Sequence, residues 1–222
     1  MTEGHDEDAS LMLRVQRGDR AAFESLVDRH RLAIFNFVHR TLRDVEESED
    51  VAQQVFVQVW KAAGRYRVQS RFTTWLFTIA RNLCLNELRR RGRHPVESLD
   101  APFETADGEV DREPPDTTRP GVTDEMLLAE LEHRIEESLA DLPEAQRSAI
   151  LLFREKELAY EEIAEVLGVS VSATKSLIHR GRETLRRRLK AYLRTGEWSP
   201  GDALDARDEA DARRATFPTR RF

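Results

Sequence analysis

Apolar residues recur at steps of three and four along two separate blocks of this chain, and this spacing constrains the fold more than any other feature. Such spacing places apolar side chains along one face of a helix. No segment alternates apolar and polar residues with a period of two for long enough to predict a strand. We therefore predict an all-α protein built from two small helical domains.

The first block predicts four helices. A short helix over residues 11–17 precedes a long one that begins near Asp19, and Ser48 is placed to cap the start of the third. The fourth begins at Phe72, after an interruption by the sequence GRYRVQSR. Four residues on these apolar faces are predicted to be buried in the core: Trp60, Phe72, Trp75 and Cys84.

Charge is strongly divided along the chain, although the net charge of −6 alone argues against a nucleic-acid partner. Residues 81–93 carry five arginines against one glutamate, and residues 174–190 carry seven basic residues against one glutamate. Between them, residues 97–130 carry eleven acidic residues against two arginines. The acidic segment hides two basic patches in the total, and such patches are typical of nucleic-acid binding.

Residues 95–122 form a natural boundary between the blocks. This stretch contains five prolines and the turn pair Asp107-Gly108, with few aliphatic residues, so it cannot bury enough surface to fold by itself. We interpret it as a flexible acidic linker. Residues 194–222 have no sustained apolar periodicity and are predicted to be a disordered tail.

The most specific motif lies in residues 158–189, within LAYEEIAEVLGVSVSATKSLIHRGRETLRRRL. An apolar helix is followed by Gly168, which supplies a left-handed turn, and then by Ser170 or Ser172 as the cap of a polar helix with a basic end. This order is typical of a DNA-binding helix-turn-helix. The alternative is an ordinary helical hairpin whose basic end complements the helix dipole, but seven basic residues exceed that need.

The two blocks, read in this order, resemble the bacterial extracytoplasmic-function (ECF) sigma factors, the initiation subunits of RNA polymerase. The similarity covers about residues 10–94 and 130–193 and rests on EDVAQQVFVQVW, FTTWLFTIARNLCLNELRRRGR, LPEAQRSAILLF and AYEEIAEVLGVSVSATKS. It implies sigma region 2 at residues 10–94, for polymerase binding and minus-ten recognition and melting, and sigma region 4 at 123–193, for the minus-thirty-five element.

The resemblance implies that the third helix binds the clamp coiled coil of core RNA polymerase and that the flap is a second polymerase contact. Polar groups beside an apolar seam can fix the direction of a partner helix. Without the resemblance, a solvated helix face would be the simpler interpretation. The polymerase-binding candidates are Asp50, Gln53, Gln54, Phe56, Val57 and Trp60.

The loop before the fourth helix, together with that helix, is implied to bind the melted minus-ten strand. Asn82 and Asn86 are four residues apart and therefore share a face, and asparagine can bond a base edge through its paired donor and acceptor. Tyr66 could stack on a base or plug the end of the bundle, and both alternatives stay open. The minus-ten candidates are Tyr66, Arg67, Gln69, Arg71, Asn82, Asn86, Arg89 and Arg90.

The polar side of the last helix would enter a major groove, with its arginines near phosphates. The minus-thirty-five candidates are Ser172, Lys175, Ser176, His179, Arg180, Arg182 and Arg186. Three positions depart from the pattern of the family. Gln54 replaces an acid, Leu177 replaces an arginine, and Gly181 is expected to interrupt a helix.

Two other functions compete with a sigma factor. A response-regulator type of transcription factor would need an α/β receiver domain, and residues 10–94 predict no strands. A helical enzyme would use His30, His39 or His133, but the chain has no HExxH motif, no repeated ExxH pair and no glycine-rich phosphate loop. We therefore predict no catalytic residue, no metal site and no cofactor.

The remaining expectations concern partners and location. The partners are core RNA polymerase, promoter DNA as duplex and melted strand, and, by the resemblance, an anti-sigma factor. No run approaches the roughly 18 apolar residues of a membrane span, and the N-terminus is acidic, so we expect a cytoplasmic protein without membrane insertion. A single cysteine excludes an internal disulfide.

Overall fold

The computed structural model describes residues 3–68, 70–93, 120–155 and 158–195, and every regular element within these ranges is helical. The all-α prediction is therefore confirmed. Residues 94–119 and 196–222, which contain most of the predicted linker and tail, lie outside the described residues. None of the described helices combines the length and apolar character that a membrane crossing needs.

In chain order the elements are α1 (Glu3–Val15), α2 (Arg20–Leu42), α3 (Val45–Ala62), the short 3-10 helix η1 (Ala63–Arg65), α4 (Phe72–Arg93), α5 (Pro120–Ala140), α6 (Glu144–Arg154), α7 (Tyr160–Leu167) and α8 (Val171–Thr195).

The first bundle consists of α1 to α4, with α2 packed against each of the other three. Its core is built from the apolar faces that the sequence spacing predicts, and Leu26, Val38, Val55 and Leu76 are fully buried there. Burying one such side chain contributes about 1.5–3 kcal/mol relative to leaving it in water. These faces therefore hold the four helices together.

Helix caps set where α2 and α3 begin. The Asp19 carboxylate accepts a hydrogen bond from the backbone N–H of Ala22 at 3.1 Å, as predicted for a start near this residue. The cap of α3 is Asp44, whose carboxylate accepts from the N–H of Glu47 at 2.8 Å. The prediction that Ser48 is this cap is wrong. Ser48 lies inside the first turn, fully buried, and its hydroxyl donates to the carbonyl of Asp44.

Helix α1 begins eight residues before the predicted segment 11–17, at Glu3, and ends at Val15. A buried polar contact anchors its early part. The Asp8 carboxylate lies 2.8 Å from Nε2 of His30 and 2.6 Å from Nη1 of Arg29, both on α2. Burial would raise the pKa of Asp8, but the bonds and charges of His30 and Arg29 outweigh it and lower that pKa. Apolar spacing carries no signal for such an anchor.

The second bundle consists of α5 to α8, and α8 packs against α5, α6 and α7. Helix α5 begins at Pro120, so residues 120–122, the end of the predicted linker, are helical. Proline is well tolerated in the first turn of a helix because its missing N–H would have no partner there. Helix α5 therefore starts three residues before the predicted domain start at residue 123.

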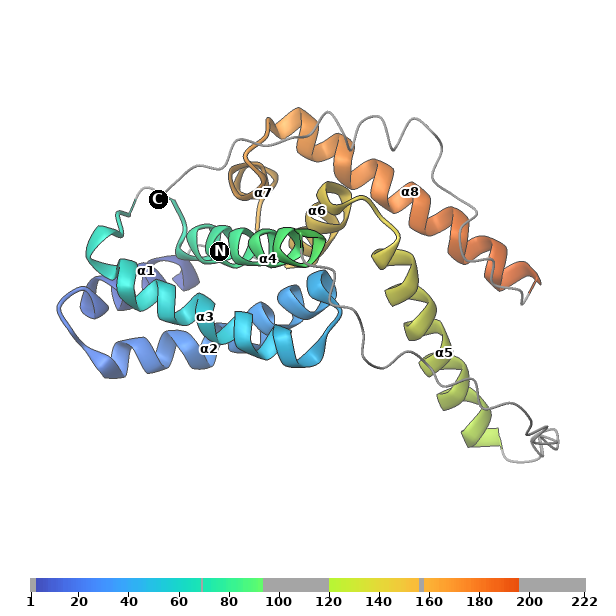
Figure 1. Ribbon diagram of the computed structural model, residues 1–222, viewed down its shortest axis with the longest axis horizontal. Coiled ribbons are helices and arrows are strands. Elements are labelled where there is room, and N and C mark those ends of the chain that lie inside the picture. The colour runs from blue at the N-terminus through green and yellow to red at the C-terminus, as the bar shows by residue number, and fades with distance from the viewer. Residues whose placement is uncertain (1–2, 69, 94–119, 156–157, 196–222) are drawn as a thin grey trace.

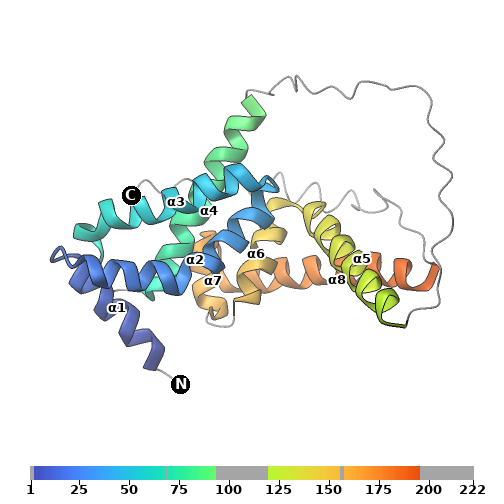
Figure 2. The ribbon, with the colours of Figure 1, turned by 90° about the horizontal axis from the view of Figure 1, so that it is seen from below.

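The two bundles pack against each other. Helix α4 contacts α7, and α2 contacts α5 and α6. Figure 1 shows α4 between the rest of the first bundle and the pair α6 and α7, and Figure 2 shows α8 alongside α6 and α7. The fourth helix, with its asparagine pair, thus lies beside the helix-turn-helix.

Candidate nucleic-acid and polymerase interfaces

The helix-turn-helix is formed by α7 and α8. Gly168 ends α7 in the left-handed conformation, with φ 70° and ψ 32°, and its N–H bonds back to the carbonyls of Ala164 and Glu165. Ser170 then caps α8, because its hydroxyl oxygen accepts from the N–H of Ala173 at 3.1 Å. Of the two serines considered as caps, Ser170 fills that position. Ser172 lies inside the helix, where its carbonyl accepts from the hydroxyl of Ser176.

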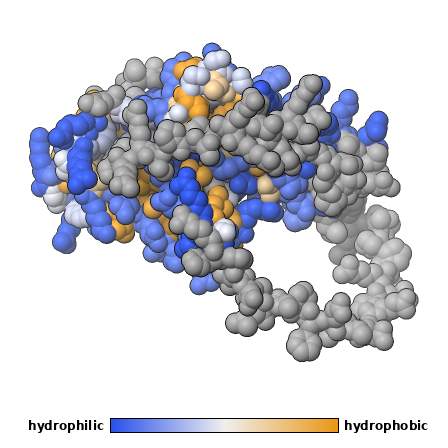
Figure 3. Space-filling model, turned by 45° about the horizontal axis from the view of Figure 1, so that its top comes forward, coloured by the Kyte–Doolittle hydropathy of each residue, from blue (hydrophilic) through white to orange (hydrophobic). Residues whose placement is uncertain are grey.

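The outer side of α8 is open to solvent. All seven minus-thirty-five candidates are exposed, whereas Thr174, Ile178 and Thr184 on the opposite side are buried. Hydrophilic residues cover much of the face shown in Figure 3, with orange hydrophobic patches between them. The exposed candidates are Ser172, Lys175, Ser176, His179, Arg180, Arg182 and Arg186.

Two of these cations lie over aromatic rings of the neighbouring helices. Nζ of Lys175 is 5.5 Å from the ring centre of Tyr160, and the Arg182 guanidinium is 5.9 Å from that of Phe153. The two rings are themselves 5.5 Å apart. Cation–π contacts at exposed sites contribute about 0.5–1 kcal/mol, enough to bias the side-chain rotamer without fixing it.

Gly181 does not interrupt α8, contrary to the sequence expectation, and the helix continues to Thr195. A Cβ placed at Gly181 would come 2.9 Å from Cγ1 and 3.3 Å from Cδ1 of Ile150 on α6. The glycine therefore allows close approach of α6 and α8. A packing requirement, and not a break, explains this departure from the family pattern.

The loop before α4 contains one residue whose role the sequence left open. Tyr66 is 3% exposed, and its ring packs 5.1 Å from Trp75 and 6.3 Å from Phe72. Burial, with a contribution from the charge of Asp8, raises the pKa of its hydroxyl. In this conformation Tyr66 plugs the end of the bundle and presents no face for a base. Arg67 on the same loop is exposed, and Gln69 lies outside the described residues.

Asn82 and Asn86 lie on one side of α4, with Asn82 half-buried and Asn86 exposed. Asn82 lines a groove of about 280 Å³ between α3 and α4. The oxygen of Asn86 accepts from Nη1 of Arg89 at 3.4 Å. The other groove residues are Gln58, Ala62, Arg65, Trp75, Ile79 and Leu83.

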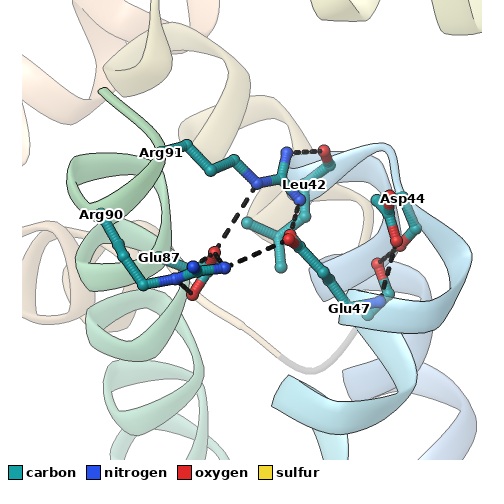
Figure 4. Close-up of polar contacts among 7 residues, drawn as sticks. Leu42, Asp44, Glu47, Glu87, Arg90 and Arg91 are labelled. Atoms are coloured by element: carbon teal, nitrogen blue, oxygen red, sulfur yellow. Dashed lines mark hydrogen bonds and ion pairs between the residues drawn. The ribbon is translucent and has the colours of Figure 1, made fainter. Parts of the chain in front are cut away.

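Arg90, the last of the predicted phosphate contacts on α4, is engaged within the protein. Its guanidinium lies 2.7 Å from Glu87 and 3.3 Å from Glu47 of α3. The hydrogen bond from Arg90, followed by the charges of Arg90 and Arg91, lowers the pKa of Glu87 despite an opposing effect of burial. Figure 4 shows these groups joined to Arg91, which also donates to the carbonyl of Leu42 at 2.8 Å. The network clamps the end of α4 to the start of α3.

The candidate polymerase face lies on α3. Asp50, Gln53 and Gln54 are exposed on this helix. A groove of about 420 Å³ lies between α2 and α3. Trp60 is 39% exposed and contacts Phe23 edge-on at 5.0 Å, so the prediction that it is a core residue is wrong. The groove is lined by Arg20, Phe23, Glu24, Phe56, Val57, Trp60 and Lys61.

Of the other three predicted core residues, two are buried and one is partly buried. Phe72 and Cys84 are buried, and Trp75 packs against the core while half-exposed to the groove beside Asn82. Burial, followed by the charge of Glu144, raises the pKa of the Cys84 thiol to about 12. The thiol is therefore neutral near pH 7 and behaves as a small apolar group.

Ion pairs join the bundles, and the sequence analysis missed them. Arg40 of α2 lies 4.0 Å from Glu136 of α5. Arg71, at the end of the loop, lies 3.0 Å from Glu162 of α7. Arg81, almost completely buried on α4, lies 3.3 Å from Glu144 of α6, which also accepts from the hydroxyl of Ser148. Arg81 was counted in a basic patch, but in this arrangement it is covered by the second bundle.

Comparison with known proteins gives matches to both blocks. The family model described as Sigma-70 region 2 matches residues 26–94, and the model described as Sigma-70, region 4 matches residues 132–185. The chain is 37% identical over 194 residues to the RNA polymerase sigma-H factor of Pseudomonas aeruginosa, covering 85% of this chain and 97% of that protein. It is 34% identical over 179 residues to the ECF RNA polymerase sigma factor SigW of Bacillus subtilis, covering 80% and 94%.

Two solved complexes contain chains of similar structure. One is CnrH in complex with the cytosolic domain of CnrY, with a TM-score of 0.61, 26% identity, and coverage of 84% of this chain and 99% of that chain. The other is the sigma factor RpoE in complex with the anti-sigma factor NepR from Bartonella quintana, with a TM-score of 0.55, 26% identity, and coverage of 76% and 96%.

Proposed function

Because this chain belongs to the ECF RNA polymerase sigma factors, we propose that it reads a promoter at two places, using one helical bundle for each. A sigma factor gives core RNA polymerase its promoter specificity. Residues 10–94 act as sigma region 2 and residues 120–193 as sigma region 4, joined by the acidic segment between them. The chain acts as a binding subunit, and the chemistry of RNA synthesis belongs to the polymerase.

Helix α8 reads the upstream minus-thirty-five element as duplex DNA. Its exposed side offers Lys175 and Ser176 near the start of the helix, where a recognition helix contacts base edges. Arg182 and Arg186 lie about two and three turns further along, where phosphates of the same groove pass. In this arrangement, residues near the start of α8 recognise the base sequence, and residues further along bind the phosphate backbone of any DNA sequence.

Helix α4 and the loop before it bind the melted minus-ten strand. Asn82 and Arg65 line one groove, which places a base-reading amide and a guanidinium next to Trp75. Arg89 is exposed on the same helix and can contact a phosphate. Tyr66 and Arg90 drop out of the proposed contact set, because the first is buried and the second pairs with Glu47 and Glu87.

The exposed side of α3 binds the clamp coiled coil of core polymerase. Trp60, Val57 and Phe23 form an apolar groove that a helix side chain can enter, and aromatic residues in such pockets dominate binding energies. Asp50, Gln53 and Gln54 are exposed on the same helix and can fix the direction of the partner. The flap remains the proposed contact of the second bundle.

An anti-sigma factor is the proposed regulatory partner. The Bartonella chain of similar fold was solved with an anti-sigma factor bound, and CnrH was solved with the cytosolic domain of CnrY. A partner of this kind would act on the present chain by holding the two bundles away from polymerase or DNA.

The observation that carries the proposal is that the chain presents two separate polar faces, on α4 and α8, in two different bundles. The test is selection from randomised promoter templates by core polymerase loaded with the purified protein. Selected templates are expected to share two conserved blocks at a fixed spacing. Templates that share one block, or none, would contradict two-site reading.

A further inference from the structure

The side chain of Gln16, just after the end of α1, bridges two carbonyls of a distant loop. Its amide nitrogen lies 2.8 Å from the oxygen of Ala63 and 2.8 Å from that of Tyr66. Its own backbone N–H still bonds to Met12, so the residue continues the last turn of α1. One side chain therefore ties the N-terminal helix to the turn that leads from α3 toward α4.

The side chain at this position must donate two hydrogen bonds. Both neighbours are carbonyl oxygens, which accept hydrogen bonds, and the two hydrogens of one –NH2 group can satisfy both. A carboxylate of the same shape would have no hydrogen to donate and would place its charge against two acceptors. Glutamate at position 16 therefore breaks both bonds while conserving volume.

The bridged turn is held by its ring as well as by its backbone. Tyr66 is buried against Trp75 and Phe72, while the residues on either side, Arg65 and Arg67, are exposed. The Tyr66 carbonyl also accepts from Nη1 of Arg67 at 3.0 Å. Fixing the backbone at Tyr66 thus sets the positions from which the side chains of Arg65 and Arg67 extend into solvent.

Arg65 lines the groove that contains Asn82. We propose that Gln16 is a positioning residue for this groove, so that α1 takes part in binding the melted strand without touching it. This inference rests on the proposed function of α4 and its loop. It adds the N-terminal helix to the proposed site, because none of the site residues named above lies on α1 or at its end.

The test compares Gln16→Glu with Arg17→Gln in the full chain bound to core polymerase. Each substitution lowers the net charge by one at adjacent positions, but Arg17 is exposed and takes no part in the bridge. The measurements are the affinity of each holoenzyme for a template with a pre-melted bubble and for the same template as duplex, the affinity for core polymerase, and the Tm of the free protein. Asn82→Ala serves as the variant that removes a proposed direct contact.

Gln16→Glu is expected to lower bubble affinity about tenfold, because binding must then fix a turn that two hydrogen bonds of ordinary strength hold in the wild-type protein. The affinities of Gln16→Glu for duplex DNA and for core polymerase should stay close to those of the wild type. Arg17→Gln should match the wild type in all three affinities. Equal losses of bubble, duplex and core affinity in Gln16→Glu would show a purely structural role and overturn the inference. Unchanged bubble affinity would overturn it as well.

Measuring the bubble affinity of Asn82→Ala distinguishes a failure of the inference about Gln16 from a failure of the proposed function of α4. If Asn82→Ala weakens bubble binding and Gln16→Glu does not, the inference fails and the function stands. If Gln16→Glu weakens bubble binding and Asn82→Ala does not, the loop acts as inferred and the assignment of Asn82 fails. If neither variant weakens it, both fail.

Discussion

Arg71 and Glu162 form a two-point ion pair between the bundles, with Nε 3.0 Å from Oε1 and Nη1 3.1 Å from Oε2. Arg71 belongs to the loop assigned to the melted strand, and Glu162 belongs to the first helix of the helix-turn-helix. Under the proposed function, a carboxylate thus occupies the position that a DNA phosphate would take on Arg71. If the loop binds DNA as proposed, the second bundle competes with DNA for Arg71 in this arrangement.

Replacing Glu162 by Gln should therefore increase the affinity of the free protein for single-stranded DNA. The substitution removes the charge but keeps an oxygen that can accept from the N–H of Ala159, as Glu162 does at 2.6 Å. Because the pair is partly exposed, the gain should be about twofold to fivefold and should shrink as salt is added. Fluorescence anisotropy with a labelled strand measures it. Glu161→Gln, an equal charge change on the exposed side of α7, is the control, and equal gains in both variants would contradict this role.

A second prediction separates residues of α8 that recognise the base sequence from residues that bind phosphates. Arg186→Ala should weaken binding to all selected promoters similarly and lower the salt slope by about 0.9, the value for one lost phosphate contact. Lys175→Ala should instead change which upstream sequences are preferred. Filter binding of the holoenzyme across a salt series, with several upstream elements, makes the comparison. Identical behaviour of the two variants would mean that the recognition helix is assigned in the wrong orientation.

The close approach at Gly181 can be tested by stability alone. Gly181→Ala gains about 1 kcal/mol of helix propensity, but its Cβ would lie 2.9 Å from Cγ1 of Ile150, and overpacking a core costs about 1–3 kcal/mol. We expect a net loss of free energy of unfolding, measured by urea titration. Gly92→Ala, in α4 with no atom within 4 Å of the added Cβ, is the control and should not destabilise the protein. A Gly181→Ala protein as stable as wild type would show that α6 and α8 pack less closely.

The anchor of α1 predicts a dependence on pH. The pKa of Asp8 lies below its ordinary value of 3.8, so its ion pairs stabilise the folded state above that pH and lose this effect as pH falls through the lowered pKa. Asp8→Asn should cost about 2 kcal/mol of unfolding free energy near neutral pH, and the difference from wild type should shrink below pH 3.8. Urea unfolding of both proteins from pH 7 to pH 3 measures the difference. A difference that is constant over this range would contradict the role of the charge.

The sequence predicted what depends on local spacing and missed what depends on contacts between distant residues. The faces of α2, α3 and α4 and the turn at Gly168 follow from residues within one or two turns of each other. The pairs Arg71–Glu162 and Arg81–Glu144 join residues 91 and 63 positions apart, so no local pattern reports them. Tyr66 was ambiguous for a related reason. An aromatic residue in a loop serves equally well as a plug or as a stacking surface until its neighbours are placed.

The central claim is that Asn82 and Asn86 contact bases only after the strands separate. A group that touches one of two states shifts the equilibrium between them by its full interaction energy. The double variant Asn82→Ala, Asn86→Ala should therefore leave the affinity of the closed complex unchanged. It should destabilise the open complex by about 2–4 kcal/mol relative to the closed complex, if each contact contributes about 1–2 kcal/mol. Permanganate reactivity of promoter thymines in the mutant and wild-type holoenzymes is the direct measurement. Reduced reactivity with unchanged duplex binding is the predicted result, and normal reactivity, or a defect confined to duplex binding, would contradict the assignment of α4 to the melted strand.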